Sequence, residues 1–350
     1  MLTARELCAA GMRVTLLERH AVAQEASWAG GGILSPLYPW RYLDSVTRLA
    51  TFSQGVYPDL VRQLAEDTGI DPEYQPSGML VVAPDEEEDA LAWARLAGRR
   101  VERVGPSDCA ALEPAMGRPP ASALWLPRVG QVRNPRLTRA LRSDIERRGV
   151  RVLEHTPAAG LLTAQDRVTG IQTADGEISG DAVVVCAGAW TRELLADLPA
   201  APDVHPVRGQ MLLFHGSPGA IRRIVLERSR YLIPRRDGRI LFGSTVEETG
   251  FDKSTTAAVR DELYALATAR FPVLSGFPIE RHWAGLRPGS PAGVPYIARH
   301  PELSNLFVNA GHFRNGIVLG PASARLLADL LLERPPVVPP EPYGLNAPRG

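Results

Sequence analysis

The fold class is decided by residues 2–18, which have the sequence LTARELCAAGMRVTLLE. Good helix formers fill residues 2–10, and Gly11 stands where a helix commonly ends on a left-handed residue. Residues 13–17 are mostly apolar, as in a strand that is buried on both faces of a parallel sheet. A helix, a tight turn and a buried strand in this order predict the second half of a βαβ unit.

Glu18 ends this predicted strand and is the first candidate for a ligand contact. In a dinucleotide-binding βαβ unit, an acidic residue here binds the adenosine ribose, about 20 residues after a glycine-rich turn. Counting back from Glu18 places the last glycine of that turn before Met1, so we expect the first strand and the turn to lie outside these 350 residues. A solvated surface charge is the alternative interpretation of Glu18.

Two later segments repeat the pattern of a buried strand followed by glycine and a helix. Residues 181–188 (DAVVVCAG) precede a helix expected over residues 191–198. Residues 306–311 (LFVNAG) precede a helix expected over residues 317–332. Ligands bind beyond the carboxyl ends of such strands, where helix N-termini favour negative charge. The segment after the last strand, HFRNGI at residues 312–317, is therefore a candidate cofactor site.

A second candidate is the small-residue segment ASWAGGGIL at residues 26–34. Glycines let the backbone approach a flat ligand closely, and they leave N–H groups free for phosphates or ring carbonyls. A flexible loop is the alternative interpretation, because runs of glycine also occur where no ligand binds.

Short apolar strands of another character lie between these segments. We expect them at residues 80–83, 211–214, 231–234 and 240–243, and the last two are joined by the turn RRDG. They predict a mainly antiparallel sheet, covered by a helix over residues 256–271.

The predicted fold class is α/β, or α+β overall, with a Rossmann-like nucleotide-binding domain interleaved with a substrate-binding domain built on the antiparallel sheet. We expect the nucleotide-binding domain at 1–72, 130–201 and 284–334, the substrate-binding domain at 73–129 and 202–283, and an extended, proline-rich tail at 335–350.

The composition narrows the class of partner. Lys and Arg number 39 and Asp and Glu also number 39, so the chain has no net positive charge to attract nucleic acid or an anionic membrane. No segment stays apolar over the ~20 residues that a membrane span requires. Three cysteines without metal-ligand spacing predict neither a disulfide framework nor a metal site, and they favour the cytoplasm.

Five segments of the chain resemble the D-amino acid oxidase superfamily of FAD enzymes and, within it, the glycine oxidase family. They are LLER at 16–19, AGGG at 29–32, CAGAW at 186–190, WAGLRP at 283–288 and GHFRNG at 311–316. The resemblance runs to about Leu332. It implies non-covalent FAD and oxidative deamination of glycine, sarcosine or small D-amino acids by hydride transfer to flavin. The products would be glyoxylate or another 2-oxo acid, ammonia and hydrogen peroxide.

The resemblance also implies biological context and site residues. The imine would supply thiazole synthesis in thiamine biosynthesis, with thiazole-synthesis enzymes as possible partners and a homo-oligomeric state. The residues expected to bind FAD are Glu18 and Arg19 at the ribose, Ala26 and Ser27 at the phosphates, Ala158 at the adenine, and Gly31, Gly32, Ile33, His312, Phe313, Arg314, Asn315, Gly316, Ile317 and Val318 at the flavin.

Three residues are expected to bind the substrate. The resemblance implies that Arg287 pairs with the substrate carboxylate, that Tyr231 adds a hydrogen bond, and that Arg314 stands at the same site. From the residues alone, Arg287 could be a surface arginine and Tyr231 a core aromatic residue.

Two alternatives to the predicted function stay open. One is a sarcosine oxidase or a D-amino acid dehydrogenase of the same superfamily, although no cysteine follows Cys186 to hold a covalent flavin. The other is a truncated, flavin-free remnant that acts only as a binding protein or is inactive.

Overall fold

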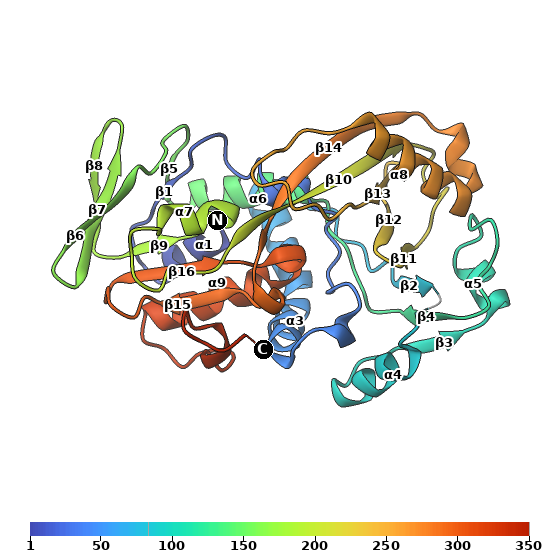
Figure 1. The fold of residues 1–350 in the computed structure, drawn as a ribbon, viewed down its shortest axis with the longest axis horizontal. Helices are drawn as coiled ribbons and strands as arrows, with labels where there is room; N and C mark the ends of the chain where they lie inside the picture. The colour runs from blue at the N-terminus through green and yellow to red at the C-terminus, as the bar shows by residue number, and fades with distance from the viewer. Residues whose placement is uncertain (83, 350) are drawn as a thin grey trace.

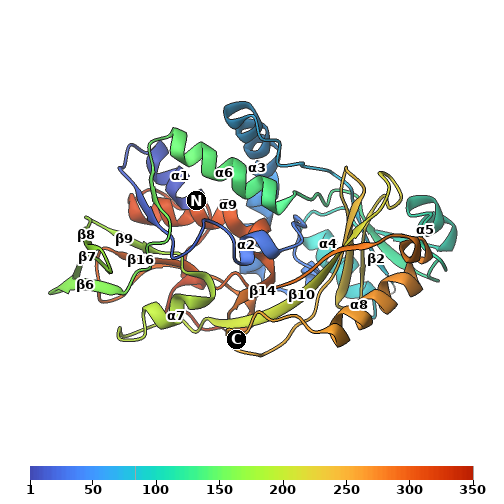
Figure 2. The same ribbon diagram turned by 90° about the horizontal axis from the view of Figure 1, so that it is seen from above.

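The computed structural model describes residues 1–82 and 84–349. Its elements form two lobes that are connected by the long strands β10 (His205–His215) and β14 (Ile279–Gly289) (Figures 1 and 2). The first lobe contains α1 (Leu2–Ala9), α2 (Ala26–Ala29), α3 (Asp44–Thr68), α6 (Asn134–Arg147), α7 (Thr191–Leu194) and α9 (Gly316–Leu331), with β1 (Thr15–Leu17), β5 (Arg151–Leu153), β6 (Gly160–Ala164), β7 (Arg167–Thr173), β8 (Gly176–Ser179), β9 (Val183–Val185), β15 (Tyr296–Arg299) and β16 (Leu306–Ala310). The second lobe adds β2 (Met79–Val82), β3 (Glu102–Val104), β4 (Ala123–Leu126), β11 (Ile224–Glu227), β12 (Arg230–Pro234) and β13 (Arg239–Gly243), with α4 (Glu87–Leu96), α5 (Pro106–Leu112) and α8 (Ala257–Arg270).

The first lobe has the parallel pairing that its apolar strands predict. Strand β1 pairs in parallel with β5, and β9 pairs in parallel with β16. Gly11 follows α1 with φ +85°, a conformation that glycine adopts at little cost. Helix α9 packs against α3, burying Leu319 and Leu326 against Leu49. Because each fully buried leucine contributes about 1.5–3 kcal/mol, this packing holds the first turn of α9 in place.

The second lobe is built on an eight-stranded sheet in the order β14-β10-β13-β12-β11-β2-β4-β3. All neighbouring strands are antiparallel except β11 and β2. Side chains alternate across it, so Leu212 and Phe214 pack against Leu263 of α8, while Met211 and Tyr231 face the opposite cluster. Figure 2 shows α8 lying along this sheet. The alternation therefore directs Tyr231 away from α8.

These findings confirm the predicted fold class, and several details differ from the sequence predictions, among them the strand expected at 211–214, which is part of the longer β10. Helix α7 ends at Leu194 instead of Leu198: Leu195 leaves the helical conformation with φ −110° and ψ 12°, and the chain continues in turns, in which the Leu198 N–H donates to the Leu195 carbonyl. The tail is not simply extended: a 3₁₀ turn forms at Glu341–Tyr343, and the buried Tyr343 hydroxyl donates to the Ser45 carbonyl at 2.8 Å. The strand expected at 80–83 is β2, and its last residue, Ala83, lies outside the described residues.

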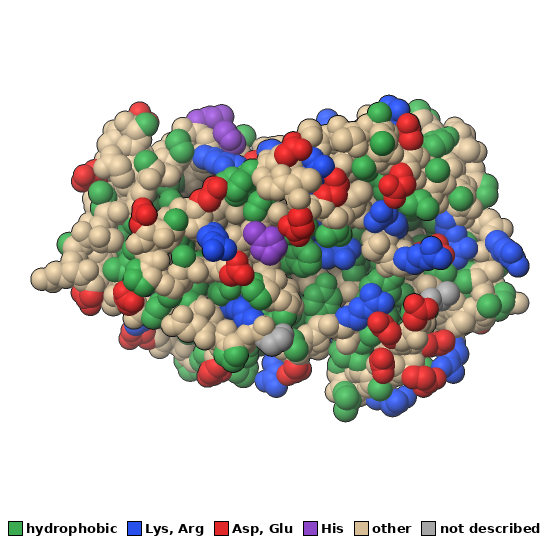
Figure 3. Space-filling view, viewed as in Figure 1, with side chains coloured by type: hydrophobic (Ala, Val, Ile, Leu, Met, Phe, Trp, Pro, Cys, Tyr) green, Lys and Arg blue, Asp and Glu red, His purple; other side chains and the backbone are tan. Residues whose placement is uncertain are grey.

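Within the described residues, no helix combines the length and the apolar character needed to cross a membrane. Acidic and basic side chains are interspersed over the face seen in Figure 3, in keeping with the net charge of zero.

Candidate functional site

Residues 30–32, which we call the glycine segment, follow α2 and pack directly on the sheet face that carries Tyr231. A Cβ on Gly31 would lie 2.6 Å from Cδ1 of Ile233 and 3.2 Å from Cε2 of Tyr231. Gly32 has φ +78°, and a Cβ there would lie 2.1 Å from the Val132 carbonyl oxygen. Only glycine fits this close approach, so the flexible-loop interpretation of the segment does not hold.

Arg235 holds this segment from the turn after β12, a role that the sequence did not reveal. Its guanidinium donates to the carbonyls of Gly31 at 2.7 Å and Val132 at 2.9 Å, and to Oε1 of Gln131 at 2.7 Å. Burial lowers the pKa of Arg235 to about 10, so the side chain remains charged at neutral pH. The sequence shows Arg235 only as a turn residue among many arginines.

The segment between β16 and α9 presents polar atoms that lack partners. Among the described residues, Nη2 of Arg314 and both side-chain polar atoms of Asn315 are buried without a hydrogen bond. His312 is directed elsewhere: its Nε2 lies 3.0 Å from Oγ of Ser323, and burial lowers its pKa to about 4. The first turn of α9 also leaves backbone N–H groups without helical partners. This segment therefore offers donors, one acceptor and positive charge to a ligand.

Arg287 lies on β14 opposite Val207 and points toward Tyr231. Its Nη1 donates to the Arg208 carbonyl at 3.2 Å, and its Nη2 donates to Oγ of Ser244 at 2.5 Å. Gly209 makes room for it, because a Cβ there would lie 2.1 Å from Nη2. Burial lowers the pKa of the Arg287 guanidinium, and the nearby positive charge of Arg314 lowers it further.

Tyr231 reaches the same serine from β12. It is 8% exposed, and its hydroxyl donates to Oγ of Ser244 at 3.3 Å and lies 3.6 Å from Sδ of Met211. The structure thus brings together Tyr231, Arg287 and Arg314, the three residues that the sequence proposed for substrate binding. We call them the anion corner.

The expected nucleotide residues form a second group along the first lobe. The backbone of Glu18 bonds Leu153 and Thr156 at 2.9 Å, which brings the segment leading to Ala158 beside the end of β1. The carboxylate of Glu18 accepts from the His20 N–H at 3.1 Å. The Cζ atom of Arg19 lies 3.6 Å from the centroid of the Trp190 ring, over its face. Arg19 also pairs with Glu25, directly before Ala26 and Ser27 of α2.

The donor and acceptor set fits a flavin. Besides the atoms of Arg314 and Asn315, Oδ1 of Asn134 is buried without a partner, and a Cβ on Gly32 would lie 2.5 Å from it. Each unpartnered buried polar atom costs about 1–3 kcal/mol. A flat ring with both carbonyl and N–H edges can satisfy such atoms beside a glycine backbone. The fold and this site are those of a flavin-dependent enzyme.

The chain belongs to the FAD dependent oxidoreductase family, whose pattern matches residues 1–330. It is 48% identical to glycine oxidase of Pseudomonas aeruginosa, over 98% of this chain and 94% of that protein. It is 33% identical to the bifunctional protein ThiO/ThiG of Trichormus variabilis, over 94% of this chain and 50% of that protein. The crystal structure of glycine oxidase from Geobacillus kaustophilus superposes with a TM-score of 0.93 at 28% identity, covering 100% of this chain and 96% of that one. The predicted enzyme class and the cofactor FAD are thereby confirmed.

Proposed function

We propose that this protein oxidises glycine and closely related small amino acids, with FAD as cofactor and dioxygen as electron acceptor. The products are glyoxylate or the matching 2-oxo acid, ammonia and hydrogen peroxide. The similarity to glycine oxidases supports the substrate class. The observation that carries the proposal is the anion corner: of the described residues, no carboxylate forms an ion pair with Arg287 or Arg314. Removing a cation even partly from water without a carboxylate partner is costly unless a ligand supplies one.

Arg287 binds the carboxylate of the amino acid. Its Nη1 donates one N–H to the Arg208 carbonyl, and its Nη2 donates one N–H to the Ser244 hydroxyl. Each nitrogen keeps a second N–H, and these two can form a bidentate pair with a carboxylate. Such a pair leaves the substrate free to rotate about one axis, and the Tyr231 hydroxyl removes that freedom by binding the same carboxylate. Arg314 adds positive charge. The substrate is thereby held in one orientation, which is the main contribution that protein side chains make here.

The glycine segment and residues 312–318 hold the flavin, and FAD, when bound, supplies the two-electron oxidation of the substrate C–N bond. Glu18, Arg19, Ala26, Ser27 and Ala158 are proposed to hold the adenosine and phosphate end. The domain boundaries stay a proposal, and the one at 283/284 falls inside β14.

We also propose that the imine product supplies thiazole synthesis and that the protein is a cytoplasmic homo-oligomer. The similarity to the bifunctional protein ThiO/ThiG supports the first point, since one chain there carries both names.

Anaerobic reduction of the flavin tests the proposed function. We expect glycine to bleach the visible flavin absorption of the purified holoenzyme, and readmitted oxygen to restore it with hydrogen peroxide as product. Sarcosine and D-alanine serve as comparison substrates. If none of the three substrates reduces the flavin, the proposal is contradicted. If sarcosine reduces the flavin much faster than glycine does, the protein is instead a sarcosine oxidase.

A further inference from the structure

Ser244 is a fully buried residue that connects the two side chains proposed to bind the substrate carboxylate. It directly follows β13 and has 0% exposure. Its Oγ accepts from Nη2 of Arg287 at 2.5 Å and from the hydroxyl of Tyr231 at 3.3 Å. Its backbone carbonyl accepts from Nη1 of Arg230 at 2.8 Å. One hydroxyl therefore contacts both Arg287 and Tyr231.

Three neighbouring strands fix the place of this hydroxyl. Gly243 pairs with Tyr231 on β12 and with Met211 on β10, so Ser244 stands one residue beyond both. A Cβ on Gly209 would collide with the Arg287 guanidinium. The backbone thus leaves room for the guanidinium beside Ser244, and the contact between them is part of the sheet geometry.

The chemistry of the three groups decides which way their protons point. A guanidinium only donates hydrogen bonds, whereas a serine hydroxyl has one proton to donate and two lone pairs to accept with. Ser244 must therefore accept from Arg287, whereas its contact with Tyr231 can run in either direction: Tyr231 donates to Ser244, or the two hydroxyls turn and Ser244 donates to the oxygen of Tyr231. When Ser244 donates to Tyr231, the Tyr231 proton is free to turn toward a bound carboxylate. Hydrogen bonds in such a chain polarise and strengthen one another.

We propose that Ser244 is a positioning residue for substrate binding: its hydroxyl fixes the Arg287 guanidinium and directs the Tyr231 proton to the substrate carboxylate. The inference rests on the proposed function of the anion corner and adds a residue to it. Ser244 does not itself touch the substrate in this account. Its loss should therefore weaken binding of the carboxylate and leave the oxidation of bound substrate nearly intact.

The test compares three variants of the holoenzyme. Acetate is the probe, because it has the carboxylate and no amine to oxidise, and its binding is followed by the change in the flavin absorption spectrum. We expect Ser244→Ala to raise the Kd of acetate and the KM of glycine about ten-fold, as for loss of a hydrogen bond to a charged group, with kcat changed less than about three-fold. Ser244→Thr keeps the hydroxyl and should restore both constants to within about two-fold of wild type.

Thr245→Val is the matched control. It removes the next hydroxyl along the chain, which contacts Glu247 and the Gln210 N–H and touches neither Arg287 nor Tyr231. We expect it to leave the Kd of acetate unchanged. Should Ser244→Ala fail to hold flavin, Ser244→Cys makes the same test, because a thiol of similar size is a weak hydrogen-bond acceptor.

The outcomes separate this inference from the proposed function. An unchanged acetate Kd in Ser244→Ala would overturn the inference, and so would an equal loss of affinity in Thr245→Val. A fall in kcat as large as the rise in KM, without rescue by Ser244→Thr, would also overturn it, by showing a structural role. If glycine fails to reduce the wild-type flavin while Ser244→Ala still weakens acetate binding, the substrate proposal fails and the positioning role stands.

Discussion

Arg208 and Arg287 lie on paired strands, the first buried and the second partly buried, and their charges are satisfied in opposite ways. Arg208 is 6% exposed, and its guanidinium binds Glu247 at 2.7 Å and Asp252 at 2.5 Å. Arg287 donates to a backbone carbonyl and to the Ser244 hydroxyl, and none of the described carboxylates forms an ion pair with it. Both are donors with a full charge, so the missing carboxylate at Arg287 is the informative difference. A partly buried cation without a carboxylate partner is expected where a ligand brings the anion.

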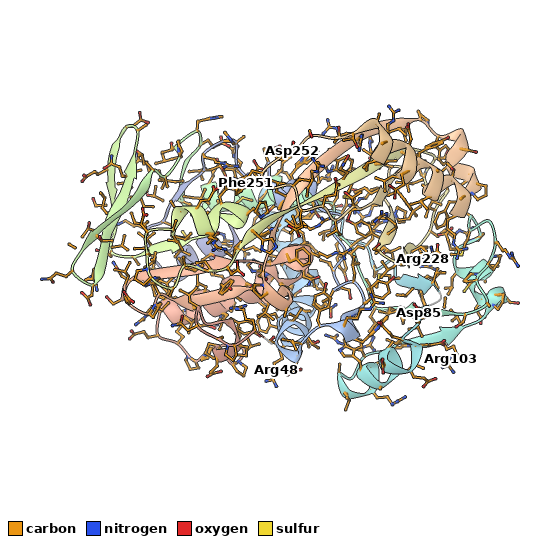
Figure 4. All side chains as sticks on the ribbon, viewed as in Figure 1. Arg48, Asp85, Arg103, Arg228, Phe251 and Asp252 are labelled. Carbon is orange, nitrogen blue, oxygen red and sulfur yellow. The ribbon has the colours of Figure 1, made fainter. Side chains whose placement is uncertain are left out.

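The ion pairs of Arg208 extend from its buried guanidinium to an exposed carboxylate. Figure 4 shows Asp252 beside Phe251 at the edge of the molecule, and the Asp252 side chain is 51% exposed. Arg208, Glu247 and Asp252, which we call the Arg208 cluster, thus extend from the sheet to the surface. The cluster connects residues 245–254 to the sheet. We interpret it as a structural cluster and the anion corner as a binding site.

The largest effect is expected from Arg287→Ala. Removing one partner of a desolvated, charge-assisted pair costs about 2–5 kcal/mol, which is roughly 30-fold to several-thousand-fold in kcat/KM. Steady-state kinetics with glycine measure it, and the flavin content should stay near that of wild type. A kcat/KM within about three-fold of wild type would show that Arg287 does not bind the substrate, and the proposed functional difference between Arg287 and Arg208 would then be wrong.

The next effect concerns pH, because His312 lies two residues before Arg314 of the anion corner and its ring is shielded from water. The pKa of His312 is lowered by burial to about 4, whereas an unfolded histidine titrates near 6.5. Between these values the unfolded chain binds more protons, so the free energy of unfolding should rise with pH through this window. We expect about 2 kcal/mol less stability at pH 5 than at pH 7, and His312→Asn should flatten this dependence. A slope that the variant shares with wild type would show that another group causes it.

Arg208→Met should affect stability more than catalysis. It leaves Glu247 without its ion pair, and the expected loss is about 1–3 kcal/mol, below that of a fully buried pair because the cluster reaches solvent. Urea unfolding of the holoenzyme measures this loss, and kcat/KM per bound flavin should stay within about three-fold of wild type. A variant of normal stability with weakened glycine binding would place Arg208 in the binding site instead.

Asp252→Asn should have the smallest effect. Its carboxylate is the exposed end of the Arg208 cluster, and exposed ion pairs contribute little to stability. We expect the urea midpoint of this variant to match that of wild type within error, in the same unfolding series as Arg208→Met. A loss as large as that of Arg208→Met would show that residues 245–254 depend on this contact.

The sequence predicted the elements that depend on local pattern and missed contacts that depend on register. The apolar strand that ends at Ala310 and the helix that begins at Gly316 were found because apolar runs and periodicity are local signals. The substrate residues entered through resemblance to a family, since an arginine-rich chain offers no composition signal for one arginine.

Ser244 and Arg235 could not be found in this way. Ser244 meets Arg287 across 43 residues, and Arg235 meets Gly31 across 204. Which side chains meet at such separations depends on strand order and register, and alternation along one strand does not determine either.

A crystal structure of the FAD-loaded protein with acetate bound would test the central claim most directly. The account predicts an acetate carboxylate within hydrogen-bond distance of both Nη atoms of Arg287 and of the Tyr231 hydroxyl, with the Arg208 cluster unchanged. An acetate bound elsewhere, or a protein carboxylate such as Glu247 turned onto Arg287, would contradict it.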